Sequence, residues 1–123
     1  MMKKRIFGKT KELAPLQLIE LLKNKKLSYI KLILLFGSRA ENKHHCQSDY
    51  DFAIFAEEDV KYPWGVIAQV WNDMGDILDL PDYDYDIVDL KYANSCIVGS
   101  IKENYILLKG DEDELQRLFT QYD

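Results

Sequence analysis

The sequence predicts a single α+β domain spanning residues 1–123, in which short strands alternate with amphipathic helices. Two stretches indicate the strands: KLILLF is a continuous apolar run of strand length, and DYDFAIF alternates between polar and apolar residues. Between and around them, apolar residues recur at helical spacing. The composition, 47% apolar and 30% charged, is that of a globular chain rather than a disordered one.

The first half of the chain predicts one helix and two strands. Leucines and an isoleucine at helical spacing follow Pro15, which suits a first helical turn, and the pattern fades in the lysine-rich stretch 23–26. KLILLF then predicts a buried strand that ends at Gly37. In DYDFAIF, Asp49 and Asp51 share one strand face, and Phe52 lies on the other.

The second half predicts two further strands and three helices. Apolar positions after Pro63 form one helical face, which Pro81 closes. YDYDIVDL predicts a third strand, a helix follows over residues 93–104, and YILL predicts a short edge strand before Gly110. DEDELQRLFTQY predicts a last helix, because acidic residues suit a helix N-terminus.

Composition also narrows the classes of function. The longest apolar run, residues 32–36, is too short to cross a membrane, and the basic N-terminus lacks the apolar stretch of a signal peptide. Two cysteines, Cys46 and Cys96, are too few for a disulfide framework, so we expect a cytoplasmic protein with Cys96 in the core. A net charge of −5 argues against direct binding of nucleic acid.

A candidate site for phosphate and metal lies around the two central strands. Gly37 and Ser38 end the first strand, where glycine admits close approach of a ligand to the backbone and serine adds a hydroxyl donor. Asp49 and Asp51 point the same way, and their repulsion would be cancelled by a shared divalent cation such as magnesium. A phosphate-binding turn beside a magnesium site is typical of enzymes that transfer phosphoryl or nucleotidyl groups.

A third carboxylate on a neighbouring strand would complete this metal site. Asp86 in YDIVDL is the preferred candidate. Asp84 shares its predicted face and Asp89 lies just beyond it, so both remain alternatives. We predict that Asp84 is a bystander.

The order Gly-Ser, ten residues, Asp-x-Asp resembles the signature of the polymerase-beta-like nucleotidyltransferase superfamily. With its strand context and the later Asp86, the whole chain looks like the minimal nucleotidyltransferase (MNT) domain proteins. That resemblance implies a small mixed or antiparallel sheet flanked by helices. It also implies that Asp49, Asp51 and Asp86 are catalytic and bind two magnesium ions, and that Gly37 and Ser38 hold the phosphates of ATP.

The same resemblance implies a partner. Minimal MNT proteins lack the helical domain that larger nucleotidyltransferases use to hold an acceptor, and they are commonly encoded beside a HEPN-domain toxin. The expected activity is transfer of AMP from ATP to a tyrosine of that toxin. Two alternatives stay open: a non-catalytic antitoxin that acts by binding alone, and a nucleotidyltransferase acting on a small-molecule acceptor.

Several residues near the motif are ambiguous. Arg39 is a candidate for nucleotide contact, although a surface arginine in a turn is the simpler interpretation. Glu41 and Asn42 stand where relatives often have an arginine and a glycine. Glu41 therefore removes a positive charge near the phosphates, and Asn42 could take the turn conformation. The stretch from His44 to Cys46 suggests zinc only weakly, because a second ligand pair is missing.

Overall fold

A computed structural model of the protein describes residues 11–41, 49–56 and 64–121. These residues form four strands and four α-helices around one mixed sheet, with strand order β3-β2-β1-β4. In chain order the elements are α1 (Pro15–Leu21), β1 (Ile30–Phe36), β2 (Tyr50–Ala56), α2 (Val66–Leu78), β3 (Tyr85–Asp89), α3 (Ser95–Glu103), β4 (Tyr105–Lys109) and α4 (Glu112–Thr120). Strand β1 runs antiparallel to β2 and β4, whereas β2 and β3 are parallel. The predicted α+β class with a small mixed sheet is therefore confirmed.

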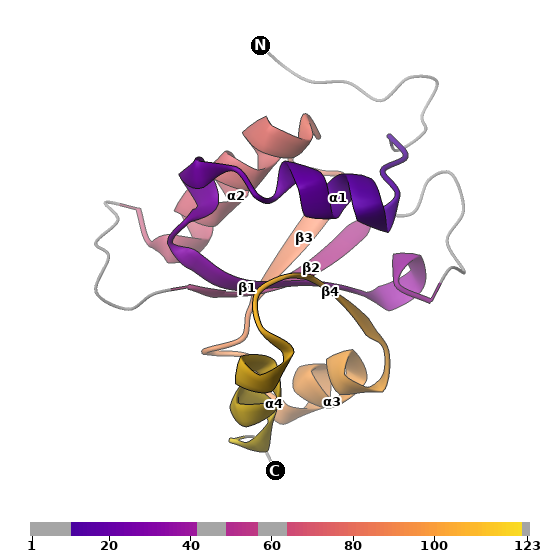
Figure 1. Ribbon diagram of the computed structural model, residues 1–123, viewed down its shortest axis with the longest axis vertical. Helices are drawn as coiled ribbons and strands as arrows, with labels where there is room; N and C mark the ends of the chain where they lie inside the picture. The colour runs from indigo at the N-terminus through magenta and orange to yellow at the C-terminus, as the bar shows by residue number, and fades with distance from the viewer. Residues whose placement is uncertain (1–10, 42–48, 57–63, 122–123) are drawn as a thin grey trace.

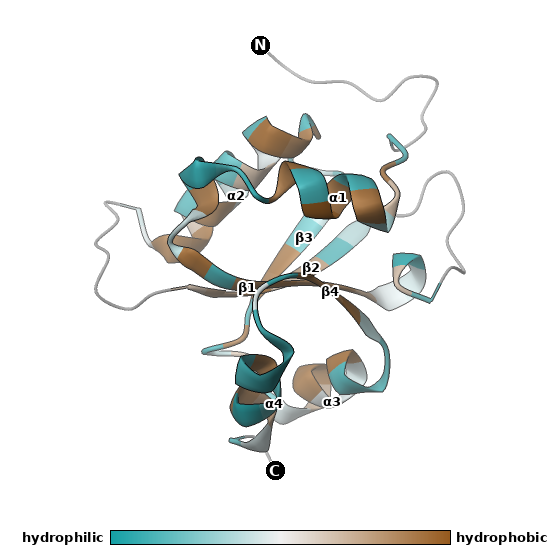
Figure 2. Ribbon diagram, viewed as in Figure 1, coloured by the Kyte–Doolittle hydropathy of each residue, from teal (hydrophilic) through white to brown (hydrophobic). Residues whose placement is uncertain are grey.

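Helices cover both faces of the sheet, as Figure 1 shows: α1 and α2 lie on one face, and α3 and α4 on the other. Strand β1 is central and packs on both sides, with Ile33 and Leu35 in the core under α1 and α2, and Leu32 and Leu34 in the core over α3 and α4. This explains why its sequence is continuously apolar rather than alternating. Figure 2 shows the same division, with hydrophobic residues gathered along the strands and on the helix sides toward them.

The helix ends follow local chemistry. Pro15 occupies the first turn of α1. The side chains of Asn94 and Asp111 cap α3 and α4 by accepting hydrogen bonds from backbone N–H groups, and α4 carries three acidic residues in its first turn. Helix α2 ends at Asp79, whose left-handed backbone (φ 55°) stops the helix before Pro81.

Two details differ from the sequence-based expectations. Cys96, predicted to be a core residue, is an exposed free cysteine, because α3 buries Val98 and Ile101 instead. Strand β3 begins only at Tyr85, so Asp84 precedes it and is buried, with 1% of its surface exposed. In the part of the chain that the structure describes, none of the helices is long and apolar enough to cross a membrane.

Candidate active site

The strand register brings the predicted site residues together. Asp51 on β2 lies between two neighbours, Phe36 at the end of β1 and Asp86 on β3. Parallel partners point to the same face of a sheet, so Asp51 and Asp86 lie side by side on the face that α3 and α4 cover. Gly37 directly follows Phe36, and the Gly37–Arg39 turn therefore begins next to the Asp51 carboxylate.

Gly37 is required at its position for two reasons. Its backbone has φ +75°, in the left-handed region that glycine adopts most easily. In addition, a Cβ atom on residue 37 would collide with Oδ2 of Asp51. The glycine thus allows the turn to approach the Asp51 carboxylate closely, which is the arrangement needed if one ligand is to contact both.

We expect Gly37→Ala to lower both stability and any activity of this site. The substitution forces a side chain into an unfavourable φ and pushes the Asp51 carboxylate away from the turn. The cost should be about 1–3 kcal/mol of unfolding free energy, measured by urea denaturation beside a nucleotide-binding assay. Gly99→Ala is the matched control, because a Cβ at Gly99 meets open space. Equal stability of the two variants would contradict the close approach.

Three carboxylates, those of Asp49, Asp51 and Asp86, lie close enough for their charges to interact. Partial burial raises the pKa of Asp51 above its ordinary value, and the negative charges of Asp86 and Asp49 raise it further. Asp49 and Asp86 are themselves exposed. The ionised form of Asp51 is therefore disfavoured until a positive group neutralises its surroundings.

The donor set of the site fits a magnesium ion. Magnesium prefers carboxylate oxygens and keeps several water or phosphate ligands, so it does not require a closed protein cage. Among the described residues, no group of three acidic, histidine or cysteine side chains is arranged to hold a metal ion by itself. The repulsion that Asp86 and Asp49 exert on Asp51 would be relieved by a cation, and a magnesium ion could take its remaining ligands from phosphate or water.

The two alternatives for the third carboxylate lie elsewhere. Asp89 pairs with Ile54 in the register and uses its Oδ1 to accept a hydrogen bond of 3.0 Å from the backbone N–H of Lys91. The buried Asp84 contributes its backbone oxygen, which accepts a hydrogen bond of 3.0 Å from the N–H of Tyr50. Of the three candidates, Asp86 is the one registered opposite Asp51, which supports the preferred assignment.

Arg39 is the last residue of the Gly37–Arg39 turn, and its side chain lies on the α1 side of the sheet. Its guanidinium is 4.0 Å from the centre of the Tyr50 ring, and Nη1 donates to both carboxylate oxygens of Glu12 at 3.2 Å. Its side chain is only 3% exposed. The hydroxyl of Tyr50 in turn donates to the backbone oxygen of Lys11 and accepts from the N–H of Leu13. This cluster ties the turn to the segment that precedes α1, so the predicted nucleotide contact of Arg39 gains no support from its placement.

The sequence does not predict the cluster around Arg39. Glu12 and Arg39 are 27 residues apart, and no periodic pattern links them. The nearest signal is the alternation that sends Tyr50 to the face opposite Asp51. Ser38 lies half-buried in the Gly37–Arg39 turn. The predicted roles of Asn42, His44, His45 and Cys46 fall on residues outside those that the structure describes.

Together, the fold and this carboxylate site define a nucleotidyltransferase domain. The chain belongs to the family described as "Polymerase beta, Nucleotidyltransferase", whose family model matches residues 17–114. That range contains the Gly-Ser turn and all three carboxylates.

A comparison with curated proteins adds a more specific similarity. The chain is 28% identical over 100 residues to the protein adenylyltransferase MntA of Aphanizomenon flos-aquae, a match that covers 75% of this chain. The matched stretch spans 65% of the length of that relative, slightly less than two thirds.

Solved structures show the same fold. A chain of a toxin–antitoxin complex crystallised with AMP-PNP has a TM-score of 0.66 and 24% identity, and the match covers 89% of this chain and 84% of that one. A complex of a tri-AMPylated Shewanella oneidensis HEPN toxin with an MNT antitoxin gives a TM-score of 0.58 at 22% identity, over 89% of this chain and 80% of that one. At these identities the likeness establishes the fold.

Proposed function

We propose that this protein transfers AMP from ATP to a tyrosine of a HEPN-domain toxin and thereby acts as its antitoxin. The observation that carries the proposal is the grouping of Asp49, Asp51 and Asp86 beside the Gly37–Ser38 turn. The similarity to the adenylyltransferase MntA supports AMP as the transferred group. A cytoplasmic location, where ATP is abundant, belongs to the same proposal.

Each site residue has a role in this proposal. Asp49, Asp51 and Asp86 would hold two magnesium ions, and Gly37 and Ser38 would bind the phosphates of ATP through backbone N–H groups and the serine hydroxyl. When bound, magnesium would neutralise phosphate charge and lower the pKa of the attacking hydroxyl. Arg39, held by Glu12 and Tyr50, would act in this proposal by positioning the Gly37–Ser38 turn.

The reaction itself is a displacement at phosphorus. The oxygen of the acceptor tyrosine forms a bond to the α-phosphorus as the bond from that phosphorus to the bridging oxygen breaks. Pyrophosphate leaves, and the hydroxyl proton passes to solvent. Asp86 is exposed on β3, which is an edge strand of the sheet, so an incoming protein can approach the site from that side. The similar complex of a tri-AMPylated HEPN toxin with an MNT antitoxin suggests this class of acceptor.

Co-expression with a HEPN protein, followed by intact-mass spectrometry, tests the function. We expect the partner to gain the mass of one or more AMP groups, and we expect this gain to disappear in Asp49→Asn. The matched control is Asp113→Asn, an exposed acid in the first turn of α4. A partner that is bound and neutralised with no gain in mass would instead support the non-catalytic alternative. Transfer of AMP to a small molecule in place of the protein would support the second alternative, a nucleotidyltransferase with a small-molecule acceptor.

A further inference from the structure

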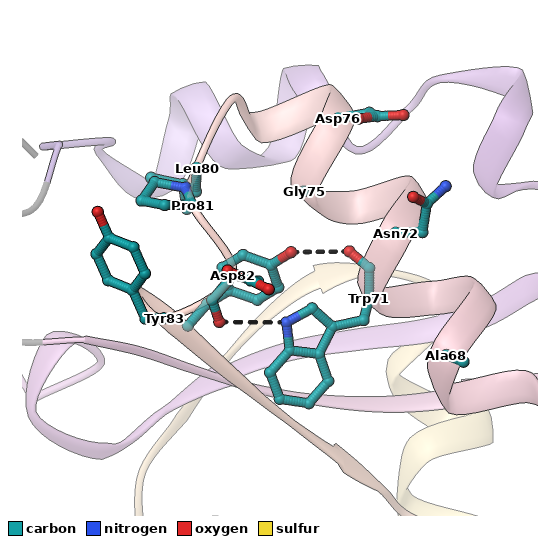
Figure 3. A pocket seen from close by; sticks show the side chains of 10 residues that line it. Ala68, Trp71, Asn72, Gly75, Asp76, Leu80, Pro81, Asp82 and Tyr83 are labelled. Carbon is teal, nitrogen blue, oxygen red and sulfur yellow. Dashed lines mark hydrogen bonds between the residues drawn. The ribbon is translucent and has the colours of Figure 1, made fainter. Parts of the chain in front are cut away.

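A groove of about 610 Å³ lies between α2 and the segment that leads into β3 (Figure 3). Trp71 and Asn72 of α2 form one side, and Asp82 and Tyr83 form the other. Tyr85, the first residue of β3, also lines the groove. None of the chemistry described so far uses this groove.

The groove is held in a defined shape by its own hydrogen bonds. The Tyr85 hydroxyl donates to the backbone oxygen of Trp71 at 2.8 Å, and the Trp71 indole N–H donates to the backbone oxygen of Asp82 at 3.3 Å. Gly75 makes room for the Tyr85 hydroxyl, since a Cβ there would collide with it. Glycine inside a helix costs about 1 kcal/mol relative to alanine. Gly75 therefore weakens α2 slightly but leaves the space that the Tyr85 hydroxyl occupies.

The lining of the groove is aromatic and acidic. It includes the carboxylates Asp76 and Asp82, and no lysine, arginine or histidine is among its described lining residues. Asp76 is partly compensated by Lys26, whose Nζ is 3.2 Å away. Burial raises the pKa of Tyr85, and the nearby charges of Asp82 and Asp76, which both line the groove, raise it further. An aromatic surface with negative charge attracts a cation.

The groove is also next to the candidate active site. Tyr85 and Asp86 are consecutive on β3, which is the edge strand, so their side chains point to opposite faces of the sheet. Tyr85 lines the groove, while Asp86 lies beside Asp51. A protein that brings an acceptor hydroxyl to Asp86 can enter the groove only by extending around this edge strand.

We propose that the groove receives an arginine side chain of the protein acceptor, which docks behind the β3 edge while its tyrosine lies at Asp86. A planar guanidinium can stack on the Trp71 ring and pair with the Asp82 carboxylate at the same time, which an ammonium group cannot do equally well. The inference extends the proposed function by naming how its acceptor is held. It depends on that function for the identity of the acceptor.

The test titrates the isolated protein with Nα-acetyl-arginine amide and follows the indole N–H signals by NMR. We expect the Trp71 signal to shift with a dissociation constant in the millimolar range, whereas the signal of Trp64, which is 88% exposed, serves as an internal control and stays in place. The neutral isostere Nα-acetyl-citrulline amide should cause at most a small shift. Equal shifts with citrulline, or equal shifts at both tryptophans, would overturn the proposal.

A charge substitution locates the binding. Asp82→Asn should weaken arginine binding several-fold and leave the fold intact, because it is the backbone oxygen of Asp82 that accepts from Trp71. The control Asp79→Asn removes the same charge nearby, at a left-handed position that asparagine tolerates. It lies outside the groove lining and should bind arginine normally. Equal weakening in both variants would indicate non-specific charge attraction and reject the groove.

The same variants separate docking from chemistry. In co-expression with the acceptor, Asp82→Asn should lower AMP incorporation at limiting acceptor while ATP binding stays unchanged. Unaltered incorporation at every acceptor concentration would reject the docking role. The NMR titration requires neither ATP nor transfer, so a failed titration leaves the proposed function standing. If the titration shows arginine binding but no AMP is transferred, the proposed function is rejected and the groove remains an arginine-binding site.

Discussion

Replacing Asp49 and Asp51 together by asparagine is expected to abolish AMP transfer without unfolding the protein. Asparagine keeps the size of aspartate but removes two of the three negative charges that face one another at the site. Without these charges the site loses its main attraction for a divalent cation. Labelled AMP from ATP should therefore no longer appear on the acceptor.

The raised pKa of Asp51 also predicts whether this double variant is more or less stable than the parent protein. The folded pKa of Asp51 is raised, so its contribution to stability is fully present below the unfolded pKa and is lost as the pH rises through the raised value. Above this raised pKa the ionised carboxylate thus destabilises the metal-free fold, and its neutral substitute should raise the melting temperature in chelator. Adding magnesium should stabilise the parent protein and leave the variant unchanged.

A second double variant controls for the loss of charge. Asp79→Asn with Asp113→Asn removes two exposed carboxylates, one at the C-cap of α2 and one in the first turn of α4, and neither belongs to the proposed site. It should keep both transfer and the magnesium-dependent rise in melting temperature. Full transfer by the folded Asp49→Asn, Asp51→Asn protein would remove these residues from the mechanism.

The elements of the fold could be predicted from the sequence because each carries a local signal. The continuous run in β1, the alternation in β2 and the helical spacing of α2 all reflect burial against a neighbouring layer. Gly37, Asp51 and Asp86 could be identified for a related reason. Residues at the ends of adjacent buried strands lie close together once the strands pair.

Contacts between distant segments could not be predicted in this way. Nothing local to Arg39 indicates that its guanidinium stacks on Tyr50 and pairs with Glu12. The alternation rule also placed Asp84 on the strand face of Asp86, but the chain turns into β3 only at Tyr85 and leaves Asp84 buried. Cys96 looked apolar enough for the core, yet α3 rotates Val98 and Ile101 toward the sheet.

The last large effect is expected at Asp86, which should matter more for the chemical step than for nucleotide binding. Asp51 lies on the strand beside the Gly-Ser turn and Asp49 directly precedes that strand, whereas Asp86 comes from the next strand. Asp86→Asn removes the charge of the proposed third ligand and leaves the Gly-Ser turn, the proposed phosphate site, untouched. The affinity for ATP should fall modestly. The rate of transfer should fall by about 10²–10⁴-fold, the loss typical of removing an activating group.

Asp89→Asn is the matched control for this experiment, because it changes the same strand on the opposite face. Its new amide oxygen can still accept the hydrogen bond from the Lys91 N–H, so both fold and transfer should be near normal. The buried Asp84 is a weaker control, since its substitution could disturb the fold. Calorimetric ATP binding and single-turnover transfer, measured on both strand variants, separate binding from chemistry. If Asp86→Asn transferred AMP at the rate of Asp89→Asn, Asp86 would not take part in catalysis despite its position beside Asp51. The third carboxylate would then have to be another residue.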